Sequence, residues 1–329
     1  AQVPELFVIS SSSAFAFAEQ FGGTREVGAE FGVRHALVGS VQINSDNIRV
    51  IAELSDTRTG ETLWTERFDR SPDDVFAVQD EITLNVLVSL QVALTEGPRA
   101  AVRGHGTRNV NAYLGLLRAE TEFLKYTRSS MIETRRLLNQ VRELDPDYYH
   151  ALILEARTHT FDAQWGYSQD TQASLRQAAT LLEEAALLDG NMSETERAEI
   201  EITRAYVEQM QGNFDAALAL ALDAAESSPN NADLLATAGW VASFDREYDQ
   251  SIQLLTSAIA HNPIYPSWYA NFLSRNYVFK GDTDRAIEWA ENGVNRSEND
   301  QRRAWALVNL VFAYMEAGNA DNARIATNE

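Results

Sequence analysis

The side chains of this chain that could do acid–base or metal chemistry are scattered. Of the five histidines, His150 and His159 are the closest pair that falls on one predicted helical stretch, and no two histidines have metal-ligand spacing. Asp73 and Asp74 are adjacent carboxylates where a helix is predicted to begin, and carboxylates there stabilise the helix dipole. Cysteine is absent, as are the phosphate-loop, dinucleotide, zinc-protease and serine-hydrolase motifs. The sequence therefore predicts no catalytic residue, no metal site and no cofactor.

Aromatic residues accompanied by arginine and asparagine point to a different chemistry. Trp240, Trp268, Asn271 and Arg275 lie within 36 consecutive positions (240–275). Rigid rings bury a large area on binding, and a guanidinium can donate two parallel hydrogen bonds to one carboxylate. Side chains of these types are typical of a protein-binding surface, and the elements that position them decide whether they form one or pack inside the fold.

Those elements repeat along the second half of the chain at one fixed distance. Five pairs of residues are each 34 positions apart (for instance 263 − 229): Ala205/Gly239, Phe214/Tyr248, Ala217/Ser251, Ala224/Ala258 and Pro229/Pro263. A period of this length is typical of stacked helical hairpins. Small residues let the two helices of a hairpin cross closely, and proline ends the second helix because it cannot continue the hydrogen-bond ladder.

The spacing and residue types resemble the tetratricopeptide repeat. The resemblance predicts an all-α solenoid over residues 112–329, made of about five to six helical hairpins of which the last is truncated. The predicted units cover about 113–147, 148–190, 198–231 and 232–265, with two more that begin near Ser267 and near Ala304.

In such repeats the first helix of each hairpin lines a concave groove, and the resemblance places aromatic residues of this chain there. Phe244, Phe272 and Phe312 also occupy groove positions, and inter-repeat core remains an alternative for half of the set. The predicted partner-binding residues are Tyr206, Trp240, Trp268, Asn271, Arg275, Trp305 and Asn309. The lysine-asparagine clamp of the chaperone-binding members is not matched.

The first 97 residues have a mixed pattern that predicts an α+β domain. LFVIS is typical of a buried strand and TREVGAEFG of a short helix. RHALVGSVQI, NIRVIAEL and ETLWTERF alternate with period two, which predicts an antiparallel meander. A helix with an apolar stripe at Val75, Val78, Ile82, Val86 and Leu90 should pack on it. Residues 98–111, rich in glycine and arginine, are predicted to be a linker.

These segments, above all DDVFAVQDEIT (73–83), resemble the TolB-like domain that precedes tetratricopeptide repeats in bacterial signalling proteins. The best resemblance is to the carboxyl-terminal half of class III adenylate/guanylate cyclases, whose catalytic domain lies upstream. Similar domain pairs also follow protein kinase or winged-helix domains. The family's first strand and helix before the LFVIS-like strand are absent here, which predicts an open sheet edge that another chain could cover.

A formal charge of −21 sets limits on the partners. Nucleic acid and anionic lipid attract cationic proteins, so neither is an expected partner. No run of about 18 apolar residues is present, which predicts no membrane span. Since the chain opens without methionine in sequence that already looks folded, we expect a piece of a longer protein. The predicted compartment is the cytoplasm, or the periplasm if a membrane span lies upstream.

The leading hypothesis is a non-catalytic regulatory and protein-interaction module of a multidomain signalling protein linked to a cyclase. Its expected partner is a protein or peptide in the repeat groove, with the protein's own upstream effector domain as one source. The sequence leaves a homodimer open. Alternatives are a free-standing adaptor, the rear part of a kinase- or winged-helix-linked regulator, and an enzyme with its site in the first hundred residues.

Overall fold

The computed structural model describes residues 7–10, 13–14, 17, 23–43, 47–71, 74–90, 106–107, 109–188, 192–297 and 299–328. They divide into two compact units. One unit is Phe17–Thr203, and the other combines Phe7–Ala16 with Arg204–Glu329. The division falls within a helix, away from the predicted linker at 98–111, most of which lies outside the described residues.

The first unit contains the predicted antiparallel meander. Strands β1 (His35–Ile43), β2 (Ile48–Asp56) and β3 (Thr62–Arg70) form a sheet in the order β1-β2-β3. The chain turns between β2 and β3 at Gly60, whose φ of 76° suits glycine because it lacks a Cβ. In the described part of the chain, β1 pairs with β2 and has no partner on its outer edge.

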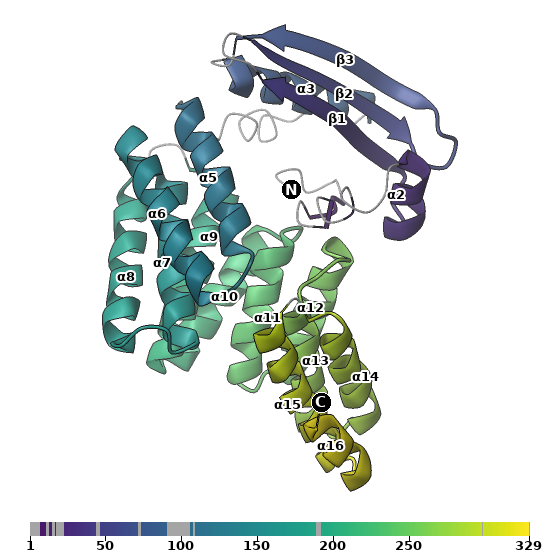
Figure 1. Cartoon of the computed structure of the whole chain (residues 1–329), viewed down its shortest axis with the longest axis vertical. Coiled ribbons are helices and arrows are strands. Elements are labelled where there is room, and N and C mark those ends of the chain that lie inside the picture. Colours follow the sequence, from purple (N-terminus) through teal and green to yellow (C-terminus); the bar gives the residue numbers. More distant parts are fainter. Residues whose placement is uncertain are drawn as a thin grey trace. The chain divides into compact units, whose positions relative to one another are not determined.

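The alternating residues of β2 bury one face of the sheet against helix α3 (Val75–Ser89), which runs along that face (Figure 1). Val78 is 1% exposed and packs with Val50 and Phe68, and Ile82 adds to this cluster. The first part of the predicted apolar stripe, Val75, Val78 and Ile82, therefore packs on the meander. A second helix, α2 (Thr24–Phe31), ends where Gly32 takes the left-handed conformation, and it confirms the short helix predicted there.

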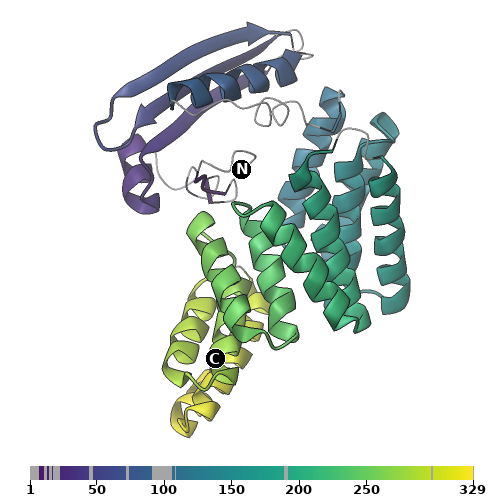
Figure 2. The ribbon, with the colours of Figure 1, turned by 180° about the vertical axis from the view of Figure 1, so that it is seen from behind.

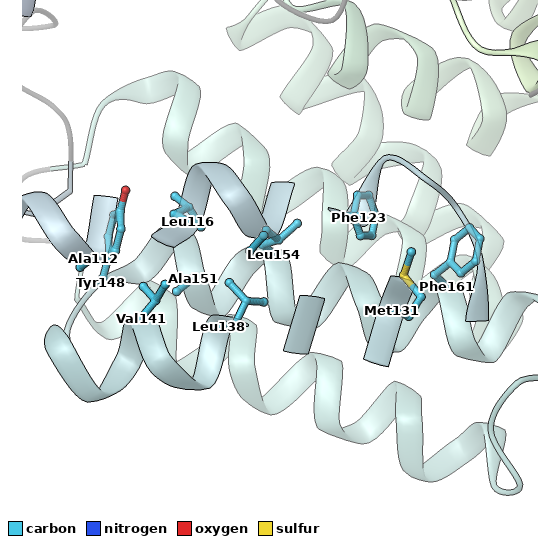
Figure 3. Close-up of a cluster of buried hydrophobic side chains, with 11 residues drawn as sticks. Ala112, Leu116, Phe123, Met131, Leu138, Val141, Tyr148, Ala151, Leu154 and Phe161 are labelled. Carbon is cyan, nitrogen blue, oxygen red and sulfur yellow. The ribbon is translucent and has the colours of Figure 1, made fainter. Parts of the chain in front are cut away.

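Helical hairpins make up the rest of this unit. Helices α5 (Val110–Phe123) and α6 (Arg128–Leu144) form one, and α7 (Tyr149–Gln164) and α8 (Thr171–Leu187) form the next. Figure 3 shows side chains from α5, α6 and α7 pointing toward one another in a shared core. Met131 and Leu138 are fully buried in it, because each hairpin covers its apolar stripe with the helix that follows.

Helix α9 (Glu194–Gln211) crosses the division between the units, and the remaining helices belong to the second unit. They are α10 (Phe214–Ser227), α11 (Ala232–Phe244), α12 (Tyr248–His261), α13 (Ser267–Phe279), α14 (Thr283–Asn295), α15 (Asp300–Glu316) and α16 (Ala320–Thr327). The first helices of successive hairpins, α11, α13 and α15, lie side by side in both views (Figure 1; Figure 2). Among the described helices, none combines the length and the apolar character that crossing a bilayer requires.

The residues of the LFVIS segment that the structure describes are not in a strand. Phe7 and Val8 are 54% and 44% exposed, and residues 7–10 have no regular secondary structure. Instead, the Ser10 amide donates to the His261 carbonyl at 2.8 Å, and the Phe7 ring lies 4.5 Å from the His261 ring. The strand prediction was wrong here because this backbone bonds to the end of α12 rather than to the sheet.

Close helix crossings are made at the small residues of the repeat. At the α11–α12 crossing, the Ser251 hydroxyl donates to the Gly239 carbonyl at 2.5 Å. At the α13–α14 crossing the roles are exchanged, since the Ser274 hydroxyl donates to the Ala286 carbonyl at 2.8 Å. One hydroxyl therefore bridges each of these two hairpins, from the second helix in one and from the first helix in the other.

A buried asparagine ties the α11–α12 crossing to the next hairpin. Asn276 is fully buried, its Nδ2 donates to Ser251 at 2.7 Å, and its Oδ1 accepts from Ser243 at 2.6 Å. The polar atoms of this amide are thus satisfied, and the bonds join α11, α12 and α13. Such a network fixes how successive hairpins stack, because any shift would leave buried polar groups unpaired.

Replacing Asn276 with alanine is expected to lower the free energy of unfolding by about 1–2 kcal/mol, because Ser243 and Ser251 each lose a buried partner. Urea denaturation followed by circular dichroism measures this. The matched control is Asn213→Ala, since the exposed Asn213 side chain donates to Glu208 on the surface, and its loss should change stability by less than about 0.5 kcal/mol. Equal effects of the two variants would contradict the network's role.

Candidate partner-binding site

A ladder of aromatic rings runs across the first helices of four successive hairpins. Tyr206 of α9 stacks on Trp240 of α11 with ring centres 4.3 Å apart and planes 9° from parallel. Phe272 of α13 lies 6.3 Å from Trp240 and 5.6 Å from Trp305 of α15. Since these helices repeat with a period near 34 residues, equivalent positions fall side by side and their rings meet.

Two of the predicted groove residues are interior in the structure. Trp240 is 4% exposed, and its ring is enclosed between Tyr206 and Phe272. Asn271 is 1% exposed and lies against Gly293, where an added Cβ would be 2.3 Å from its Oδ1. Trp240 is buried by contact with neighbouring hairpins and Asn271 by the second helix of its own hairpin, so neither side chain belongs to the exposed surface.

The other predicted groove residues lie at the surface or at its margin. Tyr206, Trp268, Arg275, Trp305 and Asn309 are partly exposed. Trp268 contacts Phe272 with ring centres 6.3 Å apart. The Asn309 amide is engaged within its own helix, where Nδ2 donates to the Trp305 carbonyl at 2.9 Å.

Arg275 stands in a group of phenylalanines from α11, α13 and α15, which we call the aromatic–arginine cluster. Its guanidinium carbon lies 4.2 Å from the ring centre of Phe244, 5.6 Å from that of Phe279 and 5.8 Å from that of Phe272. These are cation–π distances. Phe312 joins the group through Phe279 at 6.4 Å. The cluster consists of Phe244, Phe272, Arg275, Phe279 and Phe312.

Three rings of the aromatic–arginine cluster are open to a ligand. Phe244 is 37% exposed, Phe279 49% and Phe312 40%, while Phe272 forms the buried floor. Sequence reasoning did not single out Phe279. The available signal was its place four residues after Arg275, which puts the two side chains on one helix face.

Apolar exposure continues along α15 beside this cluster. Val308 and Met315 are 66% and 58% exposed, and they lie four residues before and three after Phe312. Helical spacing therefore puts all three side chains on one face of α15. A continuous exposed apolar face of this kind marks an interaction site more often than scattered single residues do.

The charge of Arg275 has no acidic partner among the described residues. Burial lowers the pKa of its guanidinium from the ordinary value, yet arginine stays protonated in proteins. Two other cations of the same unit do have acidic partners: Lys280 pairs with Asp249, and Arg285 pairs with Asp282 at 3.0 Å. Arg275 thus presents a cation whose only described close contacts are rings.

The nearest resemblance to a catalytic cluster lies in the first unit around Glu196. This buried carboxylate accepts from the Tyr149 hydroxyl and from the Ser193 amide, both at 2.6 Å, and His150 Nε2 is 3.7 Å away. Burial raises the pKa of the Tyr149 hydroxyl, which makes this group a weak acid although it donates a hydrogen bond to Glu196. Within the described ranges, no group of three or more histidine, aspartate or glutamate residues could hold a metal ion. We interpret the Glu196 cluster as a structural cap of α9.

Part of the chain is similar in sequence to a known protein whose name includes adenylate cyclase. No family model matches the chain. Over 192 residues, 58% of its length, it is 38% identical to a protein of Rhizobium meliloti (strain 1021) named putative adenylate cyclase 3. That stretch covers 32% of the relative, so the chain spans about a third of the relative's length.

Solved structures match parts of the chain at low identity. PilF of Pseudomonas aeruginosa is 12% identical, with a TM-score of 0.45 over 66% of this chain and 88% of that one. MamA of Desulfovibrio magneticus RS-1 is 16% identical, with a TM-score of 0.40 over 53% of this chain and 91% of that one. At these identities the likeness is one of fold alone.

Proposed function

We propose that this chain is a non-catalytic protein-interaction module that binds a segment of a partner protein at the aromatic–arginine cluster. The observation that carries the proposal is the cluster itself, with three exposed phenylalanines around a guanidinium that pairs with no carboxylate in the part of the chain that the structure describes. Aromatic residues and arginine are the side chains that most often dominate binding energy at protein interfaces.

The wider setting that we propose is the carboxyl-terminal part of a multidomain bacterial signalling protein of the adenylate cyclase type. The cyclase-named relative supports this, and the three-stranded sheet followed by helical hairpins is in keeping with a TolB-like domain before tetratricopeptide repeats. On this proposal the partner segment belongs to the upstream effector or to another cytoplasmic protein. A free-standing adaptor would use the same surface.

Selection from a phage-displayed library of random 12-residue peptides tests the binding proposal. We expect the wild-type chain to enrich peptides with a common pattern of apolar residues. The double variant Phe279→Ser/Phe312→Ser should enrich none of them, because both rings would be removed from the surface. Enrichment of the same peptides by both proteins, or of none by the wild type, would refute a binding site at this cluster.

The absence of catalysis is a separate prediction. Incubated with ATP and Mg²⁺, the purified chain is expected to form no cyclic AMP, since the described residues contain no cluster of carboxylates that could bind the metal. Chromatography of the nucleotides measures this, with a boiled sample as the background. Formation of cyclic AMP above that background would show that the chain is an enzyme.

A further inference from the structure

The aromatic–arginine cluster carries one positive charge, and that charge restricts what can bind. Arg275 contacts three rings, with its guanidinium carbon 4.2 Å from the nearest ring centre, and among the described residues it has no carboxylate within ion-pair distance. A desolvated cation gains most from an anion that enters the same water-poor site. The open bonding positions of the guanidinium therefore select for an acceptor on the ligand.

The size of the charge favours a carboxylate over a phosphate. A phosphorylated side chain carries about −1.5 to −2 at neutral pH and is usually held by several cations. Arg275 is the cation of the cluster, and Lys280, five residues further along the chain, is already paired with Asp249. The chain's net charge of −21 also repels ligands that carry several negative charges, nucleic acid included.

The position of Arg275 within the cluster favours an acidic side chain inside a segment over a free carboxyl terminus. Exposed rings lie on both of its sides, with Phe244 from α11 on one and Phe279 and Phe312 toward α15 on the other. A segment that crosses α11, α13 and α15 would place apolar residues on both sides of the charge. The acid then stands between two apolar anchors.

Resting on the proposed function, we infer that the cluster recognises a protein segment in which an aspartate or glutamate is flanked on both sides by apolar residues, with the carboxylate bound by Arg275. The guanidinium is held in place by its rings, so little freedom is lost when it binds. The rings supply most of the buried area, and the carboxylate fixes the register of the segment.

Calorimetric titration with synthetic peptides tests this inference. For each of several peptides enriched by the wild-type chain, three forms are compared: the parent, the form with its acid changed to the matching amide (Glu→Gln or Asp→Asn), and the parent with an amidated carboxyl terminus. We expect the acid-to-amide change to weaken binding at least about tenfold and the amidation to leave it unchanged. In the variant Arg275→Gln, parent and amide forms should bind equally.

Each other outcome overturns the inference in a recognisable way. If the acid-to-amide change leaves tight binding unaltered, the cluster binds peptides without recognising an acid. The proposed function would then hold and the inference would be wrong. Loss of binding on amidation alone would mean capture of a chain terminus. An acid-to-amide effect of equal size in Arg275→Gln would place the carboxylate elsewhere, and a single-stranded oligonucleotide that displaces the peptides would make the cluster a nucleotide-stacking site. If Arg275→Gln is poorly folded, the comparison of parent and amide peptides on the wild-type chain still tests whether the acid is recognised.

Discussion

Replacing Gly239 with leucine is expected to lower the free energy of unfolding by about 3 kcal/mol, at the upper end of the cost of overpacking. A Cβ added at Gly239 would lie 2.8 Å from Leu255 Cγ and 3.2 Å from the Ser251 carbonyl oxygen. The first contact forces a buried leucine to move, and the second is backbone that cannot move without separating α11 from α12. The hydrogen bond from Ser251 to the Gly239 carbonyl would be lost with it.

The control for this variant is Ser227→Leu, because Ser227 is the exposed last residue of α10. Thermal and urea denaturation of the two variants should separate them clearly. If Gly239→Leu unfolds no earlier than Ser227→Leu, then α11 and α12 do not cross at Gly239 and the 34-residue register is wrong.

The repeats could be predicted from the sequence because their signal is local and periodic. Ala205 and Ala217 are followed by Gly239 and Ser251 at the same distance of 34 positions. Closely packed helices need small residues where they cross. The meander was equally predictable, because apolar and polar residues alternate along β2 and this pattern indicates which face of the strand is buried. LFVIS was not, because an apolar run of five residues fits a strand and an irregular segment equally well. Only the contacts of Ser10 and Phe7 with His261 decide between them.

The site was harder to predict because position along a helix does not say how neighbouring helices cover it. Trp240 and Asn271 hold groove positions in the sequence, yet Trp240 is buried by rings of the adjacent hairpins and Asn271 by the second helix of its own hairpin. Arg275 was predicted and is partly exposed. Phe279 was missed because it ends its helix, where a repeat pattern carries little information, although it completes the cluster around Arg275.

Removing the two outer rings of the cluster is expected to abolish most peptide binding. Phe279 and Phe312 are 49% and 40% exposed, and Phe279 also stacks on Tyr248 with ring centres 5.3 Å apart, so the serine variant is expected to lose some stability. Binding is therefore compared at a temperature at which circular dichroism shows both proteins folded. A ring that anchors a ligand contributes about 2 kcal/mol or more, which is roughly thirtyfold in affinity. Loss of both should therefore weaken binding by at least that factor.

The most direct test of a partner site at this cluster is a calorimetric titration of the most enriched library peptide into three proteins. These are the wild type, Phe279→Ser/Phe312→Ser, and the control Ile325→Ser, which removes a 60% exposed apolar side chain from α16. We predict equal dissociation constants for the wild type and the control, and a value at least about thirtyfold higher for the double variant at a temperature at which circular dichroism shows all three proteins folded. Equal affinity in all three proteins would contradict the account, because the peptide would then bind away from the aromatic–arginine cluster.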